Sequence, residues 1–177
     1  MKKKSISYNA IEKEILSNKK YQRISLESHH GLTRLEHSLR VSRNVYKVSR
    51  KLNLDYVSAT RAALLHDFFT NEEFETNHGL IQGVVHPDIA LANACGEFDL
   101  NEKEKNAIVS HMFPLSVVLP RSREAWVLTA VDKVVAIYEY GLYKFNPKKA
   151  VKTLRFANYS LCFLFLFVIN ILTIGEK

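Results

Sequence analysis

The chain has 177 residues, of which 47% are hydrophobic and 24% charged, so its composition excludes wholesale disorder. Six glycines and four prolines exclude a sandwich of many short strands, and two cysteines exclude a disulfide framework or a four-cysteine zinc site. The net charge of +7 is uneven: residues 1–51 are strongly basic, whereas residues 52–143 are acidic. No nucleic-acid-reading motif accompanies the basic residues, and we expect most of these charges to lie on solvated helix faces. The alternative is an acidic, histidine-containing middle that binds cations, with basic flanks that attract an anionic substrate or a membrane surface.

Hydrophobic spacing predicts helices along most of the chain. Val41, Val45 and Val48 draw one apolar stripe, and Asp55 is suited to an N-cap. The pair Asn101 and Glu104 has the spacing of a capping box. The expected helices cover residues 9–20, 33–52, 55–69, 87–95, 101–112 and 122–140. Loops are expected at 113–121 and at 70–86, the latter with room for a short helical turn, with Gly141 ending a helix and Pro147 opening a last helical segment.

Three polar residues fall on the apolar faces of predicted helices: His37, His111 and Asp132. A charged carboxylate on a core face is costly unless it is compensated, and a bound divalent cation would compensate it and also accept neutral imidazoles. Each residue alone has another explanation, such as a hydrogen-bonded core histidine or an ion pair between Asp132 and Lys133. Their joint occurrence favours a metal site.

The adjacent pair His66-Asp67 follows an Ala/Leu-rich segment. Neighbouring helical residues point about 100° apart, so one imidazole nitrogen and one carboxylate oxygen can reach a common ion that lies between them. His37 and Asp132 would close the other side. This nitrogen and oxygen set without thiolate suits Mn²⁺, Fe²⁺, Co²⁺, Ni²⁺ or Zn²⁺, with Mg²⁺ as an alternative, and the number of ions, one or two, stays open.

These residues resemble the motifs of the HD-domain metal-dependent phosphohydrolases, as found in small bacterial HD-domain proteins. The matching segments are Leu-Glu-His-Ser-Leu-Arg-Val around His37, Ala-Ala-Leu-Leu-His-Asp-Phe around His66-Asp67, and Thr-Ala-Val-Asp-Lys-Val around Asp132. The resemblance covers about residues 28–140 and implies an all-α fold, a compact bundle of six or seven helices. Together with the charge and hydrophobicity of the flanks, it divides the chain into a basic N-terminal helical extension (1–27), an HD phosphohydrolase domain (28–143) and a basic linker with a C-terminal hydrophobic helix (144–177).

The resemblance also assigns roles to the site residues. It makes His37, His66, Asp67 and Asp132 metal ligands, and it makes His86 and His111 ligands of a second ion with Asp67 as the bridging carboxylate. As alternatives, His86 and His111 contact the substrate phosphate, or His86 caps the helix that Pro87 opens. Asp67 is also a catalytic candidate, as the base that orients water if one ion binds.

The implied reaction is hydrolysis of a phosphate ester, with a nucleotide or a related small phosphorylated molecule as substrate. A metal ion would activate water and neutralise charge that develops on the phosphoryl oxygens. Lys133, next to a ligand, is the first choice for a catalytic cation. Further candidates for phosphate binding are His30, Arg34, Arg40 and Arg121, each of which could equally be a surface residue. Glu36 is expected to be exposed.

Residues 156–175 contain no charged side chain and follow a basic stretch. They have the length of a membrane-spanning helix, and the charge bias would keep the domain on the cytoplasmic face. The alternative is a helix packed in the domain or in a homodimer interface. We expect a cytoplasmic protein, attached to the membrane if this segment spans it. Two alternative functions stay open: a di-iron oxygenase of the same fold, and a non-catalytic nucleotide-binding module tethered to the membrane.

Overall fold

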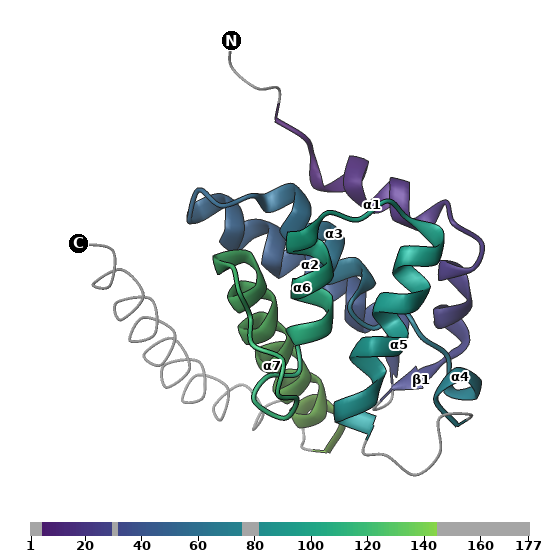
Figure 1. Ribbon diagram of the computed structural model, residues 1–177. Coiled ribbons are helices and arrows are strands. Elements are labelled where there is room, and N and C mark those ends of the chain that lie inside the picture. The colour runs from purple at the N-terminus through teal and green to yellow at the C-terminus, as the bar shows by residue number, and fades with distance from the viewer. Residues whose placement is uncertain (1–4, 30–31, 76–81, 145–177) are drawn as a thin grey trace. The chain divides into compact units, whose positions relative to one another are not determined.

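The computed structural model describes residues 5–29, 32–75 and 82–144. They form seven α-helices, one 3₁₀ helix and a single antiparallel pair of two-residue strands, which confirms the all-α prediction (Figure 1). In chain order the elements are α1 (Tyr8–Leu16), η1 (Tyr21–Leu26), β1 (Ser28–His29), β2 (Leu32–Thr33), α2 (Arg34–Lys51), α3 (Tyr56–Leu65), α4 (Asn71–Glu75), α5 (Gln82–Glu97), α6 (Glu102–Ser110) and α7 (Arg123–Lys144).

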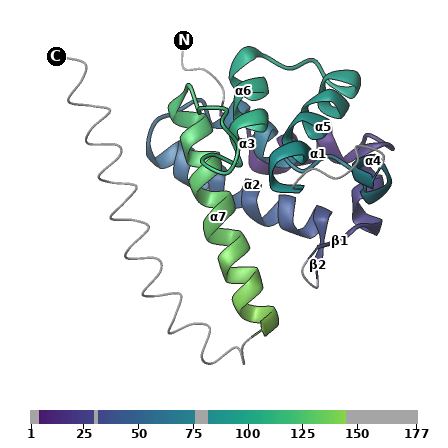
Figure 2. The same ribbon diagram turned by 60° about the horizontal axis from the view of Figure 1, so that its bottom comes forward.

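Side-chain caps set the starts of the helices that carry the site. Asp55 caps α3, and Asn101 with Glu104 forms a capping box at α6, as the sequence predicts. A second capping box joins Thr33 to Glu36 at the start of α2, three residues before the first histidine of the site. Figure 2 shows the two short strands beside this end of α2. The caps therefore define where α2, α3 and α6 begin.

Two predicted boundaries around α5 and α7 are wrong. In the segment 70–86, α4 is the short helical turn for which the prediction left room, but α5 also begins there, so Pro87 lies inside α5 and does not open it. Pro87 lies beyond the first four residues of α5, whose amides have no intrahelical carbonyl acceptor, so α5 lacks one internal hydrogen bond at this position. Gly141 likewise lies within α7 and does not end it. At both positions a single Pro or Gly predicted a helix boundary, but the helix continues through it.

The core of the unit Met1–Asp132 lies around α3. Helix α3 packs against α2, α6, α1 and α5, and its small residues Ala59, Ala62 and Ala63 are buried. Small side chains let neighbouring helices approach closely. The predicted stripe on α2 is confirmed at Val41 and Val45, which are fully buried. Because α3 is central, its C-terminal end places the His66-Asp67 pair in the interior.

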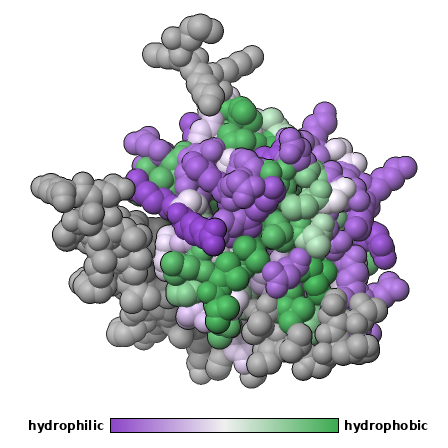
Figure 3. Space-filling view, viewed as in Figure 1, coloured by the Kyte–Doolittle hydropathy of each residue, from purple (hydrophilic) through white to green (hydrophobic). Residues whose placement is uncertain are grey.

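The chain divides into two compact units, Met1–Asp132 and Lys133–Lys177, and all residues of the site described below belong to the first. Much of the face of the molecule in Figure 3 is hydrophilic, with hydrophobic residues gathered in smaller areas.

No helix among the described residues is long and apolar enough to cross a membrane. The hydrophobic helix and the membrane contact predicted for residues 156–175 lie outside the described residues and stay predictions.

Candidate metal centre

Four histidines and two aspartates from separate elements meet in the interior of the first unit. They come from α2, from the turn that follows α3, from α5, from the end of α6 and from α7. All six side chains are buried, with at most 7% of each residue exposed. The structure thus brings together every residue for which the sequence predicts metal binding: His37, His66, Asp67, His86, His111 and Asp132.

The first donor group consists of His37, His66 and Asp132. Nε2 of His37 lies 3.0 Å from Oδ1 of Asp132 and donates a hydrogen bond to it in this structure. Nε2 of His66 lies 3.4 Å from the same oxygen. Three donor atoms from α2, the end of α3 and α7 therefore point at one small volume, which is the arrangement required to hold a cation.

The second donor group consists of His86 and His111 with one oxygen of Asp67. Nε2 of His86 lies 3.3 Å from Oδ1 of Asp67 and 2.9 Å from Nε2 of His111. Nε2 of His111 lies 3.8 Å from Oδ1 of Asp67. Two imidazole nitrogens and a carboxylate oxygen thus converge without a sulfur ligand, which suits a transition metal and not Ca²⁺.

Asp67 lies between the two groups and offers a different oxygen to each. Its Oδ2 is 3.8 Å from Nε2 of His66 and 4.0 Å from Nε2 of His37. Its Oδ1 faces His86 and His111. A carboxylate with this placement can serve both groups at once, as a bridging ligand does.

Backbone carbonyls orient two of the histidines in the same way. His66 and His111 are the C-cap residues of α3 and α6, and each Nδ1 donates to the carbonyl three residues earlier, Ala63 O at 2.8 Å and Ile108 O at 2.7 Å. A carbonyl can only accept, so Nδ1 carries the hydrogen in each ring, and in the neutral form of the ring Nε2 presents a bare lone pair to the site. This second hydrogen bond is typical of histidines that bind metals.

Burial and neighbouring charges shift the pKa values of the ionisable groups in the site. Burial opposes ionisation of Asp67 and Asp132, but the surrounding histidines outweigh it, so the pKa of each carboxyl lies below its ordinary value. Burial also disfavours a charged His66, yet Asp67 and Asp132 raise its pKa above the ordinary value. Burial, together with the neighbouring imidazoles of His66 and His86, lowers the pKa of His111 to about 3, so this ring stays neutral and able to bind a metal near neutral pH.

The residues present fit a divalent transition metal. Nε2 of His66 is fully buried and makes no hydrogen bond of good geometry among the described residues, although two carboxylates lie within 4 Å of it. Ligand atoms about 2.1 Å from a single ion lie about 3.0–3.4 Å from one another, and the distances from Asp132 to His37 and His66 fall in this range. The donor set does not distinguish Mn²⁺, Fe²⁺, Co²⁺, Ni²⁺ and Zn²⁺.

Two further residues hold the His66-Asp67 turn, and no sequence motif marks either of them. The buried hydroxyl of Tyr21 donates to the carbonyl of Leu64 at 2.6 Å, and Nδ2 of Asn93 donates to the carbonyl of Phe68 at 3.0 Å. These bonds flank the pair on both sides along the chain. A tyrosine in η1 and an asparagine in α5 look like ordinary residues until the fold brings them to this turn.

The residues for which the sequence predicts phosphate binding lie in different surroundings. Arg34 is buried, with only 1% exposed, and its Nη2 donates to Oδ1 of Asn71. Arg40 and Lys133 are half-buried, and Arg121 is exposed. His30 lies outside the described residues. Glu36 is exposed, as predicted, and serves as a helix cap. None of these positions by itself tests the predicted contact with a phosphate.

The family model of the HD domain matches residues 34–137 of this chain. The match begins at the first residue of α2 and ends shortly after Asp132, so it contains both donor groups. A comparison with curated proteins found no match. Since the matched segment covers more than half of the chain, the protein belongs to the HD-domain family, within the HD phosphohydrolase superfamily.

Proposed function

We propose that this protein is a divalent-metal-dependent phosphohydrolase that cleaves a phosphate ester of a nucleotide or of a related small phosphorylated molecule. The observation that carries the proposal is the buried donor set in which Asp67 faces two groups of histidines with different oxygens. HD-domain membership supports a hydrolytic reaction. His37, His66, Asp67 and Asp132 would hold one ion, and His86, His111 and Asp67 a second.

When bound, such ions lower the pKa of water to near neutrality and neutralise charge on phosphoryl oxygens. The chain's own residues prepare the site for this chemistry. The carbonyls of Ala63 and Ile108 hold the rings of His66 and His111 with Nε2 facing inward. The low pKa of Asp67 keeps it an anion, able either to bridge two ions or, beside one ion, to accept a proton from water. Burial of all six side chains limits the access of bulk water.

Cationic side chains would bind the substrate phosphate. Lys133 follows the ligand Asp132 directly and is our first candidate, and Arg40 lies three residues after His37 on α2. Arg121, in the segment between α6 and α7, and His30 are further candidates from the sequence. We expect Lys133→Met and Arg40→Met to raise KM for a phosphate ester more than they change metal affinity.

The proposal is tested with the purified full-length protein. Its metal content is measured, and phosphate release is followed from a panel of nucleotides and other phosphate esters after loading with Mn²⁺, Co²⁺ or Ni²⁺. We expect release of phosphate that stops on addition of a chelator and returns with metal. Asp67→Asn should abolish turnover, whereas Asp99→Asn, at an exposed carboxylate, should leave it unchanged. Absence of bound metal and of turnover on every ester would contradict the proposal.

One observation also favours a second function, a di-iron oxygenase. Two groups of histidines that face different oxygens of Asp67 suit a pair of iron ions as well as a pair of hydrolytic metals. This function predicts oxygen consumption by the iron-loaded protein with an organic co-substrate such as a polyol or a phosphonate. Phosphate release with redox-inert Zn²⁺ would instead support hydrolysis.

A further inference from the structure

Arg34 has surroundings that are unusual for an arginine. It is the first residue of α2 and only 1% of it is exposed. Its guanidinium carbon lies 3.6 Å from the centre of the Phe69 ring, and its Nη2 donates to Oδ1 of Asn71 at 2.8 Å. Its Nε has no hydrogen-bond partner among the described residues. Besides the attraction of the negative charges of Asp67 and Glu27, an aromatic face and one amide hold this buried guanidinium, and a guanidinium in this position restricts the motion of the ring that it covers.

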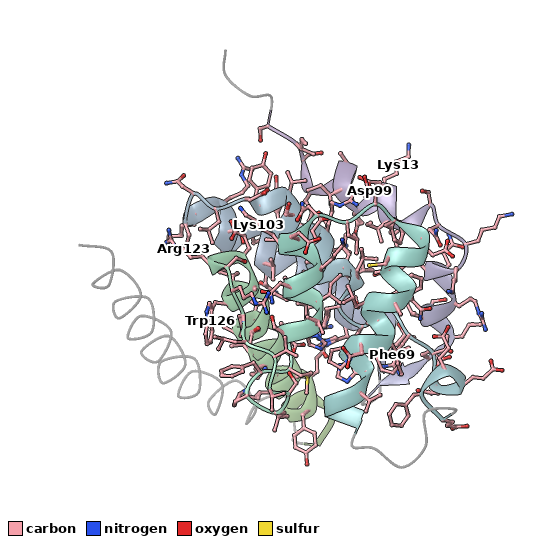
Figure 4. All side chains as sticks on the ribbon, viewed as in Figure 1. Lys13, Phe69, Asp99, Lys103, Arg123 and Trp126 are labelled. Carbon is pink, nitrogen blue, oxygen red and sulfur yellow. The ribbon has the colours of Figure 1, made fainter. Side chains whose placement is uncertain are left out.

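The same phenyl ring contacts a histidine of the second donor group. The rings of Phe69 and His86 are stacked, with centroids 5.1 Å apart and planes inclined by 29°. Phe69 itself is 1% exposed and follows Asp67 by two residues, and Figure 4 shows it beside α5, the helix that carries His86. A continuous set of contacts therefore runs from Arg34 on α2 through Phe69 to His86 on α5.

We propose that Arg34 is a positioning residue of the second donor group: by its contact with Phe69 it holds the His86 ring in place, so that Nε2 faces Oδ1 of Asp67 and Nε2 of His111. This inference rests on the proposed two-ion site but assigns Arg34 a role other than phosphate binding. Its burial and its bond to Asn71 support that role. His37 lies on the same helix, so Arg34 also connects the helix of the first group to the second.

The test substitutes Arg34→Lys, which keeps the charge and the flexible stem but loses the planar group that lies on the ring. Mn²⁺ is titrated into the full-length protein and followed by calorimetry and by electron paramagnetic resonance, which distinguishes a spin-coupled pair of ions from a single ion. Changes in residues that orient metal ligands weaken metal affinity by about 10–100-fold. We expect a loss of this size for the second ion, loss of the coupled signal, and an unchanged first ion.

The matched control is Arg43→Lys on the same helix. Arg43 is 58% exposed at its side chain and lies over the Tyr8 ring at 5.7 Å, so it makes the same kind of contact away from the site. We expect it to bind both ions as the unchanged protein does. Phe69→Leu should weaken the second ion as Arg34→Lys does, and the double variant should be no weaker than the single ones, because both remove one chain of contacts.

If Arg34→Lys fails to fold, Asn71→Ala provides the second variant, since it removes the hydrogen bond to the guanidinium from an exposed position. It should weaken the second ion selectively, with the first retained. Three results would overturn the inference. Two of them are an equal loss of both ions and the retention of both. The third is a higher KM for a phosphate ester at full metal occupancy, which would make Arg34 a substrate contact. A protein that binds one ion only would also overturn it.

These results are separable from the proposed function. Suppose that the unchanged protein binds two ions, that Arg34→Lys selectively loses the second, and that no ester is hydrolysed. This result would support the positioning role and refute the hydrolase. Ester hydrolysis together with two ions in every Arg34 variant would support the hydrolase and refute the positioning role.

Discussion

Replacement of Asp132 by asparagine tests the first donor group most directly. Oδ1 of Asp132 lies within 3.4 Å of a nitrogen of both His37 and His66, so the variant keeps the shape of the group but removes its negative charge. Two unit charges 4 Å apart attract by about 4 kcal/mol at an effective dielectric constant of about 20. Because tenfold in affinity corresponds to about 1.4 kcal/mol, loss of this charge beside a cation should weaken binding by at least about 100-fold.

The expected readout is thermal stability with and without metal. A metal at about 100 times its Kd stabilises the folded protein by about 2.7 kcal/mol. In a domain of this size each kcal/mol raises Tm by about 2–4 °C, so metal should raise Tm by about 5–11 °C. After a 100-fold loss of affinity, the same metal concentration stabilises Asp132→Asn by about 0.4 kcal/mol, or roughly 1 °C.

The assay is differential scanning fluorimetry of the chelator-treated protein with Mn²⁺, Co²⁺, Ni²⁺ and Zn²⁺ in turn. Asp99→Asn serves as the control, because its carboxylate is exposed. A full metal-induced rise in Tm in Asp132→Asn would refute the assignment of this residue, and no rise with any of the metals in the unchanged protein would refute the site as a whole.

Three further outcomes are expected. His111 has a pKa of about 3 in the folded state and an ordinary value near 6.5 when unfolded, so the unfolded chain binds more protons between these two pH values. His111 therefore lowers the free energy of unfolding as pH falls from about 6.5. In urea unfolding of the metal-free protein from pH 7 to 4.5, the free energy of unfolding should decline less in His111→Gln than in the unchanged protein. Tyr21→Phe leaves the carbonyl of Leu64 without its buried donor and should cost about 1–3 kcal/mol in urea unfolding, whereas an undiminished stability would show that the bond contributes nothing. Thr33→Ala removes a capping box and should cost about 1 kcal/mol while leaving metal affinity unchanged, since the cap lies at the surface end of α2; a large fall in metal affinity would contradict this separation.

Much of the helical fold could be predicted from local patterns. The apolar stripe of α2 and the caps at Asp55 and Asn101 depend on residues three or four positions apart, so one short segment contains the whole signal. The start of α5 was not predictable in this way. Pro87, the two glycines before it and the lack of helical periodicity indicate a loop locally, and tertiary packing favours helix there instead.

The sequence by itself indicated which side chains could form a metal site. Histidines and an aspartate on apolar helix faces, with an adjacent His-Asp pair, are too costly to bury together without a purpose, and that reasoning needs no coordinates. The residue pattern alone could not say how these side chains are divided between ions, and a division came only from the resemblance to the HD-domain phosphohydrolases. His37 and Asp132 are 95 positions apart, so their 3.0 Å contact exists only once α2 and α7 are packed.

Only the tertiary structure decided which oxygen of Asp67 faces which histidines, and that Arg34 is buried against Phe69. Both depend on the relative placement of helices that are distant in the chain. Residue type and spacing specify a donor atom and the face on which it lies, but a shift of about 1 Å between two helices changes which atoms meet, and such shifts are set by packing over the whole core.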